Sequence, residues 1–260
     1  MTVLRSILFN LAFYIASALI LVLGSPLLLG PRSWAMAGLA FHARVSLFLL
    51  RWIAGIRMEV RGRDRLPSGA ALVASKHQSA WDTFALVPLF ADPALVMKSE
   101  LLKIPFYGWF SRKFEMIFVE REKRASALKQ MLKDAQARRD QGRQILIFPE
   151  GNRRAPGAPP DYKPGIMALY DGLGLPCVPM ALNSGLYWPR RSFWRHPGTI
   201  IVEVLEPIPA GLPRKEFLRQ LEAVIEEASA RLIAEAMASK RPPPMPALPP
   251  ETASENGSLV

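Results

Sequence analysis

The amino-terminal segment is the part of the sequence that most limits how this chain can fold. No charged residue lies between Arg5 and Arg32, and the run from Ile7 to Leu29 is mostly aliphatic or aromatic. A helix of about 20 apolar residues is long enough to cross the roughly 30 Å of hydrocarbon in a bilayer. A buried helix of a soluble protein usually keeps one polar face, which this run lacks. The segment therefore predicts a helical membrane anchor.

A second apolar stretch follows, from Trp34 to Ile56, and it differs from the first because it contains His42, Arg44 and Arg51. Such an amphipathic helix is better suited to lie in the membrane interface than to cross it. Gly24-Ser25-Pro26 could end the first helix. Residues 1–56 thus form either a single membrane span or a shallow two-helix or re-entrant anchor, and the sequence leaves both open.

The whole chain is apolar and basic at the same time. Of its 260 residues, 50% are hydrophobic, which excludes a wholly disordered chain, and the formal net charge is +11. Most later apolar runs are too short to span a bilayer, which disfavours a polytopic transporter. This combination favours a protein that binds anionic lipid. A nucleic-acid-binding protein is disfavoured, because the positive charge is dispersed and no recognition motif stands out. A single cysteine, Cys177, excludes an intramolecular disulfide.

From Arg57 the pattern changes to short apolar runs that alternate with helical segments. Strands are expected at residues 57–61, 70–75, 94–97, 116–119, 144–148, 177–182 and 199–205, and helices near 83–90, 105–114, 123–139, 164–171 and 213–240. This alternation predicts an α/β domain over residues 57–240, with a central mixed, mostly parallel sheet flanked by helices. The last helix is amphipathic and is expected to pack on the domain. Residues 241–260 are Pro-rich and predict a disordered tail.

The densest polar cluster, Ser75 to Asp82, follows the second expected strand directly. His77 and Asp82 are five residues apart, so on one continuous helix they would face different directions. They can meet only if His77 lies in the turn after the strand and Asp82 opens the helix. The carboxylate would then orient the imidazole as a general base. Ser79 is a rival nucleophile in an awkward position, and a helix cap with an incidental histidine is the alternative without chemistry.

Other polar residues also stand at strand ends. Glu150, Gly151 and Arg153 follow the strand at 144–148, Lys98 ends the strand at 94–97, and Arg121 follows the strand at 116–119. If these strands share one sheet edge, their ends form a cationic cleft beside His77, which suits transfer to an anionic substrate or its hydrolysis. Taken singly, each basic residue is more often a solvated surface charge.

Other chemistries find less support. His77, Asp82 and Glu150 offer too few ligands for a metal site, and no HExxH motif or Cys cluster is present, so no metal or cofactor is expected. No G-x-S-x-G elbow supports a serine hydrolase, and Asn183-Ser184-Gly185 is interpreted as a plain turn. A membrane-binding protein without catalytic activity would explain the anchor and the charge, but not the paired base and carboxylate.

Several blocks, taken in order, resemble the glycerolipid acyltransferase family, and the lysophosphatidate acyltransferases most of all. These blocks are His77-Gln78-Ser79 with Asp82, Lys98–Pro105, Ile117 through Arg121, Phe148-Pro149-Glu150-Gly151, and Val178-Pro179. The resemblance implies transfer of a fatty acyl group from acyl-CoA or acyl carrier protein to the free hydroxyl of 1-acylglycerol 3-phosphate, giving phosphatidate. It also implies His77 as general base and Asp82 as its orienting partner. Lys98, Arg121, Glu150, Gly151 and Arg153 would bind substrate.

The sequence departs from the usual family pattern at a few positions, namely Lys76, Met116, Glu120 and Asn152. These departures leave the acceptor open, so another lysolipid such as lyso-ornithine lipid, or glycerol 3-phosphate, remains an alternative. Arg32, Arg44, Arg51 and Arg57 follow the first apolar segment, whereas only Arg5 precedes it. This bias predicts an inner-membrane protein whose catalytic domain faces the cytoplasm.

Overall fold

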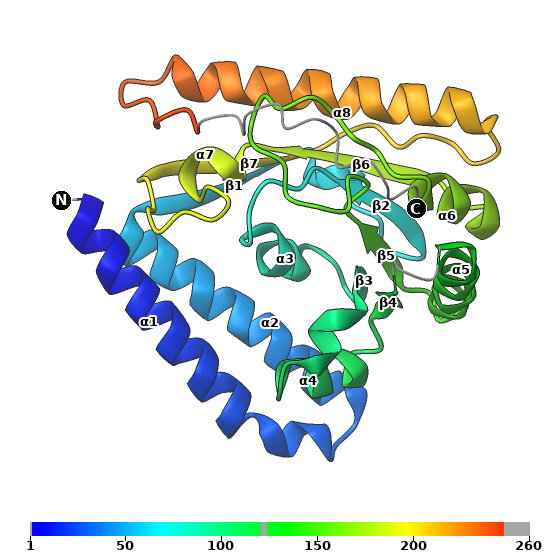
Figure 1. Cartoon of the computed structure of the whole chain (residues 1–260), viewed down its shortest axis with the longest axis horizontal. Helices are drawn as coiled ribbons and strands as arrows, with labels where there is room; N and C mark the ends of the chain where they lie inside the picture. The colour runs from blue at the N-terminus through cyan, green and yellow to red at the C-terminus, as the bar shows by residue number, and fades with distance from the viewer. Residues whose placement is uncertain (1, 121–123, 247–260) are drawn as a thin grey trace.

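The computed structural model describes residues 2–120 and 124–246 (Figure 1). In this part of the chain seven strands form one sheet, in the order β1-β7-β6-β2-β5-β3-β4. The strands are β1 (Ile56–Arg61), β2 (Ala71–Ser75), β3 (Pro93–Lys98), β4 (Ile117–Val119), β5 (Gln144–Ile147), β6 (Cys177–Leu182) and β7 (Gly198–Val204). Every neighbouring pair is parallel except β6 and β7. The predicted α/β class with a mixed, mostly parallel sheet is confirmed.

Helices cover both faces of this sheet. They are α3 (Asp82–Ala85), α4 (Tyr107–Lys113), α5 (Arg124–Asp140), α6 (Gly165–Leu173), α7 (Ser184–Tyr187) and α8 (Arg214–Met237). The central strand β2 shows why both faces are covered. Val73 lies in the apolar cluster that contains α3 and α4, whereas Leu72 and Ala74 lie in the cluster with α5, α6 and α8. A strand buried on both faces has no polar alternation, which is why β2 is an unbroken apolar run.

Some element boundaries differ from those expected. The helix expected at 83–90 is divided into α3 and a 3₁₀ turn at Val87–Leu89, because Pro88 has no N–H with which to continue an α-helix. Helix α8 ends at Met237 rather than at residue 240. Residues 241–246 of the expected tail form no helix or strand, and residues 247–260 lie outside the described part of the chain.

The amino-terminal segment folds as a helical hairpin, α1 (Thr2–Leu23) and α2 (Arg32–Leu49), joined by a 3₁₀ turn at Ser25–Leu28. A π-helical turn extends α2 to Ala54. The break expected at Gly24-Ser25-Pro26 is therefore confirmed. Helix α2 lies between α1 and the domain (Figure 1), and Ser17 Oγ lies 2.9 Å from His42 Nε2 across the hairpin. Both helices are apolar and long enough to cross a membrane by length and composition alone.

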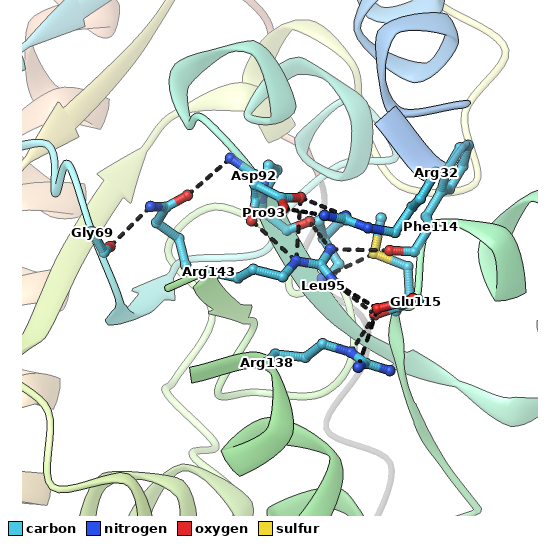
Figure 2. Close-up of polar contacts among 11 residues, drawn as sticks. Arg32, Gly69, Asp92, Pro93, Leu95, Phe114, Glu115, Arg138 and Arg143 are labelled. Atoms are coloured by element: carbon cyan, nitrogen blue, oxygen red, sulfur yellow. Dashed lines mark hydrogen bonds and ion pairs between the residues drawn. The ribbon is translucent and has the colours of Figure 1, made fainter. Parts of the chain in front are cut away.

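A buried arginine just before β5 connects backbone segments near β3 and β4, at one edge of the sheet (Figure 2). Arg143 is 1% exposed and donates to the carbonyl oxygens of Pro93, Phe114 and Glu115. Its Nε lies 3.2 Å from Asp92 Oδ1, and Asp92 also binds Arg32 of α2 through two hydrogen bonds of 2.8 and 2.5 Å. Burial lowers the pKa of Arg143 to about 10, so it stays charged at neutral pH. Through Asp92 the network fixes the hairpin to β3.

Candidate active site

The turn between β2 and α3 brings His77 and Asp82 together. Strand β2 ends at Ser75 and α3 begins at Asp82, so His77 lies in the connecting turn, as the five-residue spacing required. His77 Nδ1 lies 2.9 Å from Asp82 Oδ2. Since the carboxylate is the acceptor, the imidazole proton is assigned to Nδ1, and Nε2 is left with its lone pair. In the described residues no hydrogen bond reaches Nε2.

Asp82 is fully buried and accepts four hydrogen bonds. Its Oδ2 accepts the backbone N–H groups of Gln78 (2.8 Å) and Ser79 (2.9 Å) as well as His77 Nδ1. Its Oδ1 accepts the hydroxyl of Ser184, at 2.6 Å. Both oxygens of the carboxylate are thus held by hydrogen bonds. This arrangement fixes the direction of the imidazole.

The ring of His77 packs flat against Phe148, with centroids 4.0 Å apart and planes inclined by 18°. Phe148 directly follows β5, the strand beside β2. Stacking and the bond to Asp82 together leave the ring one orientation. Ser79, the rival nucleophile, is fully buried, and its Oγ accepts the N–H of Trp81. This geometry disfavours Ser79 as a nucleophile and favours His77 as the reactive group.

Glu150 lies in the turn after β5 and is 1% exposed. Its Oε1 accepts a hydrogen bond of 2.8 Å from Lys76 Nζ, and Lys76 also binds Glu226 of α8 at 2.7 Å. Tyr162 donates to the same Glu226 oxygen, at 3.0 Å. Burial raises the pKa of Glu150, and the charge of Lys76 opposes this shift. Glu150 Oε2 is buried without a partner. Glu150, which was predicted to bind the acceptor, is thus held by Lys76, the buried residue next to His77 in the sequence.

The loop after Glu150 reaches back to the turn between β2 and α3, which holds His77 and is called the catalytic turn below. Gly151 has φ +66°, a left-handed conformation that glycine adopts without strain. The N–H of Arg154 donates to the His77 carbonyl at 2.8 Å, which places this loop against the turn that holds His77. The side chain of Arg153 is exposed, while its carbonyl accepts a hydrogen bond of 3.0 Å from Arg190 Nη1. The loop after Glu150 thus contacts the turn that holds His77, and Arg190 joins a second loop to it at Arg153.

The strands that precede the remaining predicted residues end at the same sheet edge. β2, β5, β3 and β4 are consecutive and parallel, so their carboxyl ends meet at one edge, with neighbouring strands about 4.8 Å apart. Lys98 ends β3 two strands from His77 and is exposed. Arg121 follows β4 but lies outside the described residues. The shared edge that the sequence required is confirmed.

Three residues of this site were given no role in it from the sequence. Ser184 opens the short helix α7, where only a turn was expected, and Lys76 and Glu226 form a partly buried ion pair beside Glu150. Lys76 carried one usable signal, because it is a lysine directly after an apolar strand. Ser184 and Glu226 carried none, since their contacts span 102 and 150 residues.

Known proteins share these elements. A family model described as Acyltransferase matches residues 57–183, the segment that holds β1 to β6 and every residue of the catalytic turn. Residues 57–183 belong to the acyltransferase family. The resemblance seen in the sequence blocks is confirmed.

The metal site was disfavoured on sequence grounds, and in the described residues of this acyltransferase domain no three His, Cys, Asp or Glu side chains form a cluster that could hold a metal ion.

Relatives of the acyltransferase domain have one name in common. A Pseudomonas aeruginosa protein named 1-acyl-sn-glycerol-3-phosphate acyltransferase is 40% identical over 161 residues, 62% of this chain and 63% of that protein. A Saccharomyces cerevisiae protein of the same name is 29% identical over 217 residues, 79% of this chain and 68% of the relative. The chain thus matches somewhat less than two thirds of the bacterial relative's length.

A solved structure agrees with the fold. The crystal structure of the 1-acyl-sn-glycerophosphate (LPA) acyltransferase PlsC from Thermotoga maritima superimposes with a TM-score of 0.75 and covers 92% of this chain and all of that one. Only 21% of aligned residues are identical. At this identity the likeness supports the fold alone.

Proposed function

We propose that this protein is a membrane-bound O-acyltransferase that moves a fatty acyl group from an acyl thioester to the free hydroxyl of 1-acylglycerol 3-phosphate, giving phosphatidate. The observation that carries the proposal is the hydrogen bond between His77 Nδ1 and Asp82 Oδ2, which leaves Nε2 as a base. The base lies at the carboxyl edge of a parallel sheet, where ligands bind in open α/β folds. The names of the relatives supply the substrate class.

The reaction follows from this geometry. The acceptor hydroxyl lies at His77 Nε2, which removes its proton as the oxygen attacks the thioester carbonyl carbon. The C–S bond then breaks, and the thiolate takes the proton from the imidazolium of His77. Asp82 stabilises that imidazolium without accepting its proton. A thioester is already reactive, so positioning the two substrates supplies much of the acceleration, and no cofactor is needed.

The acceptor phosphate requires cationic partners near His77. Arg153 is exposed and lies in the loop that is hydrogen-bonded to the His77 carbonyl through Arg154. A guanidinium can bind phosphate through two parallel hydrogen bonds. We assign Arg153 this role, together with Arg121 and Lys98 from the neighbouring strand ends. Gly151 allows the backbone of this loop to approach the acceptor closely, and the buried Glu150 fixes the loop to Lys76.

The hairpin is proposed to seat the protein in one leaflet. The buried residues of α1 are Ser6, Phe9 and Asn10, all near its amino terminus, where they contact the domain. The remaining 13 residues of α1 span about 20 Å, less than the roughly 30 Å needed to cross the hydrocarbon. This geometry supports the shallow two-helix anchor over the single span. The positive-inside bias supports a position on the cytoplasmic face of the inner membrane, where acyl-CoA and acyl carrier protein occur.

A lipid-product assay on purified protein in mixed micelles tests the proposal. Two acyl donors, acyl-CoA and acyl carrier protein charged with an acyl group, are labelled in the acyl group and offered in separate arms. Each donor is tested with 1-acylglycerol 3-phosphate, glycerol 3-phosphate and lyso-ornithine lipid. Labelled phosphatidate from the first acceptor is the expected product. Acylation of another acceptor alone would overturn the substrate assignment. No acylated product from any acceptor would favour a membrane-binding protein without catalytic activity.

A further inference from the structure

The loop between α7 and β7 exposes two large aromatic side chains among arginines. We define the arginine–aromatic loop as Pro189–His196, with the sequence Pro-Arg-Arg-Ser-Phe-Trp-Arg-His. Phe193 is 50% exposed and Trp194 is 42% exposed, and their rings meet edge to face with centroids 5.6 Å apart. Paired aromatics exposed on one loop indicate a contact surface more than a folding requirement.

Hydrogen bonds fix this loop to the anchor helix α1. Ser6 Oγ accepts the N–H of Arg195 at 3.0 Å, and Asn10 Nδ2 donates to the Phe193 carbonyl at 3.0 Å. Ser6 and Asn10 are polar residues in a mostly apolar helix, and both are buried. Their hydrogen bonds to the loop explain why these two polar side chains are buried. Figure 1 shows the loop that follows α7 beside the amino-terminal end of α1.

A buried arginine makes the loop rigid. Arg195 is 4% exposed, its guanidinium lies 4.2 Å from the ring centroid of Trp188, and its Nη1 donates to the carbonyls of Ser192 and Trp194. Burial lowers the pKa of Arg195 to about 10, so the charge persists at neutral pH. In the described part of the chain no carboxylate forms an ion pair with it. The loop thus holds its shape and carries positive charge.

The surface around the loop is continuous with the apolar face of α1. The exposed apolar side chains in the first turns of α1 are Val3, Leu4, Ile7, Leu8 and Leu11, and Arg5 is exposed among them. On the loop itself Arg190 and Arg191 are exposed. Aromatic rings at the level of the head groups, aliphatic residues below them and arginines facing phosphate are what an anionic lipid surface binds.

We infer that the arginine–aromatic loop is a second membrane-contact element, which inserts Phe193 and Trp194 at the boundary between head groups and acyl chains while Arg190 and Arg191 bind lipid phosphates. The inference rests on the proposed function only in taking an anionic bilayer as the surface on which the protein works. The loop also reaches the site, because Arg190 donates to the Arg153 carbonyl. Trp188, the residue just before the loop, packs against Phe84 of α3 with ring centroids 5.9 Å apart. The depth of the loop therefore sets the height of the acceptor site above the lipid phosphates.

A depth measurement tests the loop without relying on turnover. A polarity-sensitive thiol dye is attached to Phe193→Cys in the full chain, bound to phosphatidylglycerol vesicles that contain brominated lipid. Cys177 is fully buried, and burial raises the pKa of its thiol, so it does not compete for the dye. Ala230→Cys on α8 is the matched control, since it is exposed on the layer opposite the hairpin (Figure 1). Trp194→Cys repeats the measurement if the first variant fails to fold.

Quenching by brominated lipid is expected to be several-fold stronger at position 193 than at position 230, with protection from aqueous iodide. Equal quenching at both positions would overturn the inference. Protection from iodide without quenching by lipid would also overturn it and would indicate contact with a second copy. If the label is quenched by lipid but no acyl transfer occurs, the loop inference stands and the proposed function fails. If acyl transfer occurs but the label is not quenched, the proposed function stands and the loop inference fails.

The arginines give a second readout on the labelled protein. Arg191 has φ +55°, so Arg191→Gly removes the charge and relaxes the backbone at once. Together with Arg190→Gln, this change is expected to weaken loop insertion on anionic vesicles by about five-fold per arginine, with little effect on neutral vesicles. Quenching that is unchanged on anionic vesicles would contradict a phosphate-binding role of the arginines.

Discussion

The hydroxyl of Ser184 donates to Asp82 Oδ1 at 2.6 Å and so joins the amino terminus of α7 to the catalytic turn, 102 residues earlier in the chain. Ser184 is fully buried, as is Asp82, and no solvent can replace this bond. Because Oδ2 is shared by His77, Gln78 and Ser79, Ser184 supplies the bond to the other oxygen that keeps the carboxylate from turning. We regard Ser184 as a positioning residue that acts through Asp82.

Ser184→Ala should lower kcat by about ten-fold, corresponding to about 1.4 kcal/mol, while the acceptor KM changes little. The physical reason is that Asp82 loses a buried hydrogen bond and orients His77 less firmly. Steady-state kinetics on micellar acceptor measures this. Ser229→Ala is the matched control, since Ser229 is also buried and its Oγ has no partner. Equal losses of kcat in the two variants would assign Ser184 a general packing role.

Asp82→Asn should reduce kcat by about 10²- to 10⁴-fold, as should His77→Ala, because each removes the oriented base. The amide of asparagine can keep several of the bonds that Asp82 makes, yet it favours the wrong imidazole tautomer. Single-turnover measurement of acyl transfer detects the loss, and circular dichroism confirms that the variants fold. Retained turnover in folded His77→Ala would refute the base assignment and with it the proposed mechanism.

Lys76→Met should destabilise the protein by about 3–5 kcal/mol, because it leaves the buried Glu150 without its charged partner. Denaturant unfolding measures this free energy. The double variant Lys76→Met/Glu150→Gln should recover part of the loss, since no buried charge then remains at position 150. If the double variant were less stable than the single one, the lysine would act mainly through Glu226 and α8.

The loss in Lys76→Met should also depend on pH. Burial raises the pKa of Glu150 above its ordinary value of 4.5, and Lys76 opposes this shift. Without Lys76 the folded-state pKa rises further, so above 4.5 the folded chain holds a proton that the unfolded chain releases. Stability of the variant then falls as the pH increases through that window, whereas below the unfolded value both states are protonated and the penalty disappears. Unfolding curves at pH 4 and pH 7 should therefore differ more in the variant than in the wild type.

The sequence predicted the fold well because the strands are short, apolar and separated by clear breaks. All seven expected strands are present, and the His77–Asp82 pair was predicted from its spacing and its place after β2. Both conclusions depend on contacts within a few residues. Periodicity and turn chemistry report such local relationships directly.

The sequence did not predict contacts that the tertiary fold creates. The pairing of Lys76 with Glu226 requires α8 to cross the sheet above β2, and the bond of Ser184 requires α7 to begin directly after β6. No local pattern specifies either approach. The amino-terminal hairpin shows the same limit, since the docking of Ser6 and Asn10 on the loop after α7 joins residues more than 180 positions apart in the sequence.

Arg153→Ala should raise the acceptor KM by about ten-fold and leave the donor KM nearly unchanged. The exposed guanidinium is lost, but the Arg153 carbonyl that binds Arg190 stays in place, so the loop keeps its position. Phosphate binding by arginine is weakened by salt, and the difference in KM between wild type and variant should therefore shrink at high ionic strength. Arg219→Ala, an exposed arginine on α8, is the control for a general loss of positive charge. Because donor and acceptor occupy different parts of the site, an equal rise in both KM values would show that Arg153 stabilises the loop and does not bind the acceptor phosphate.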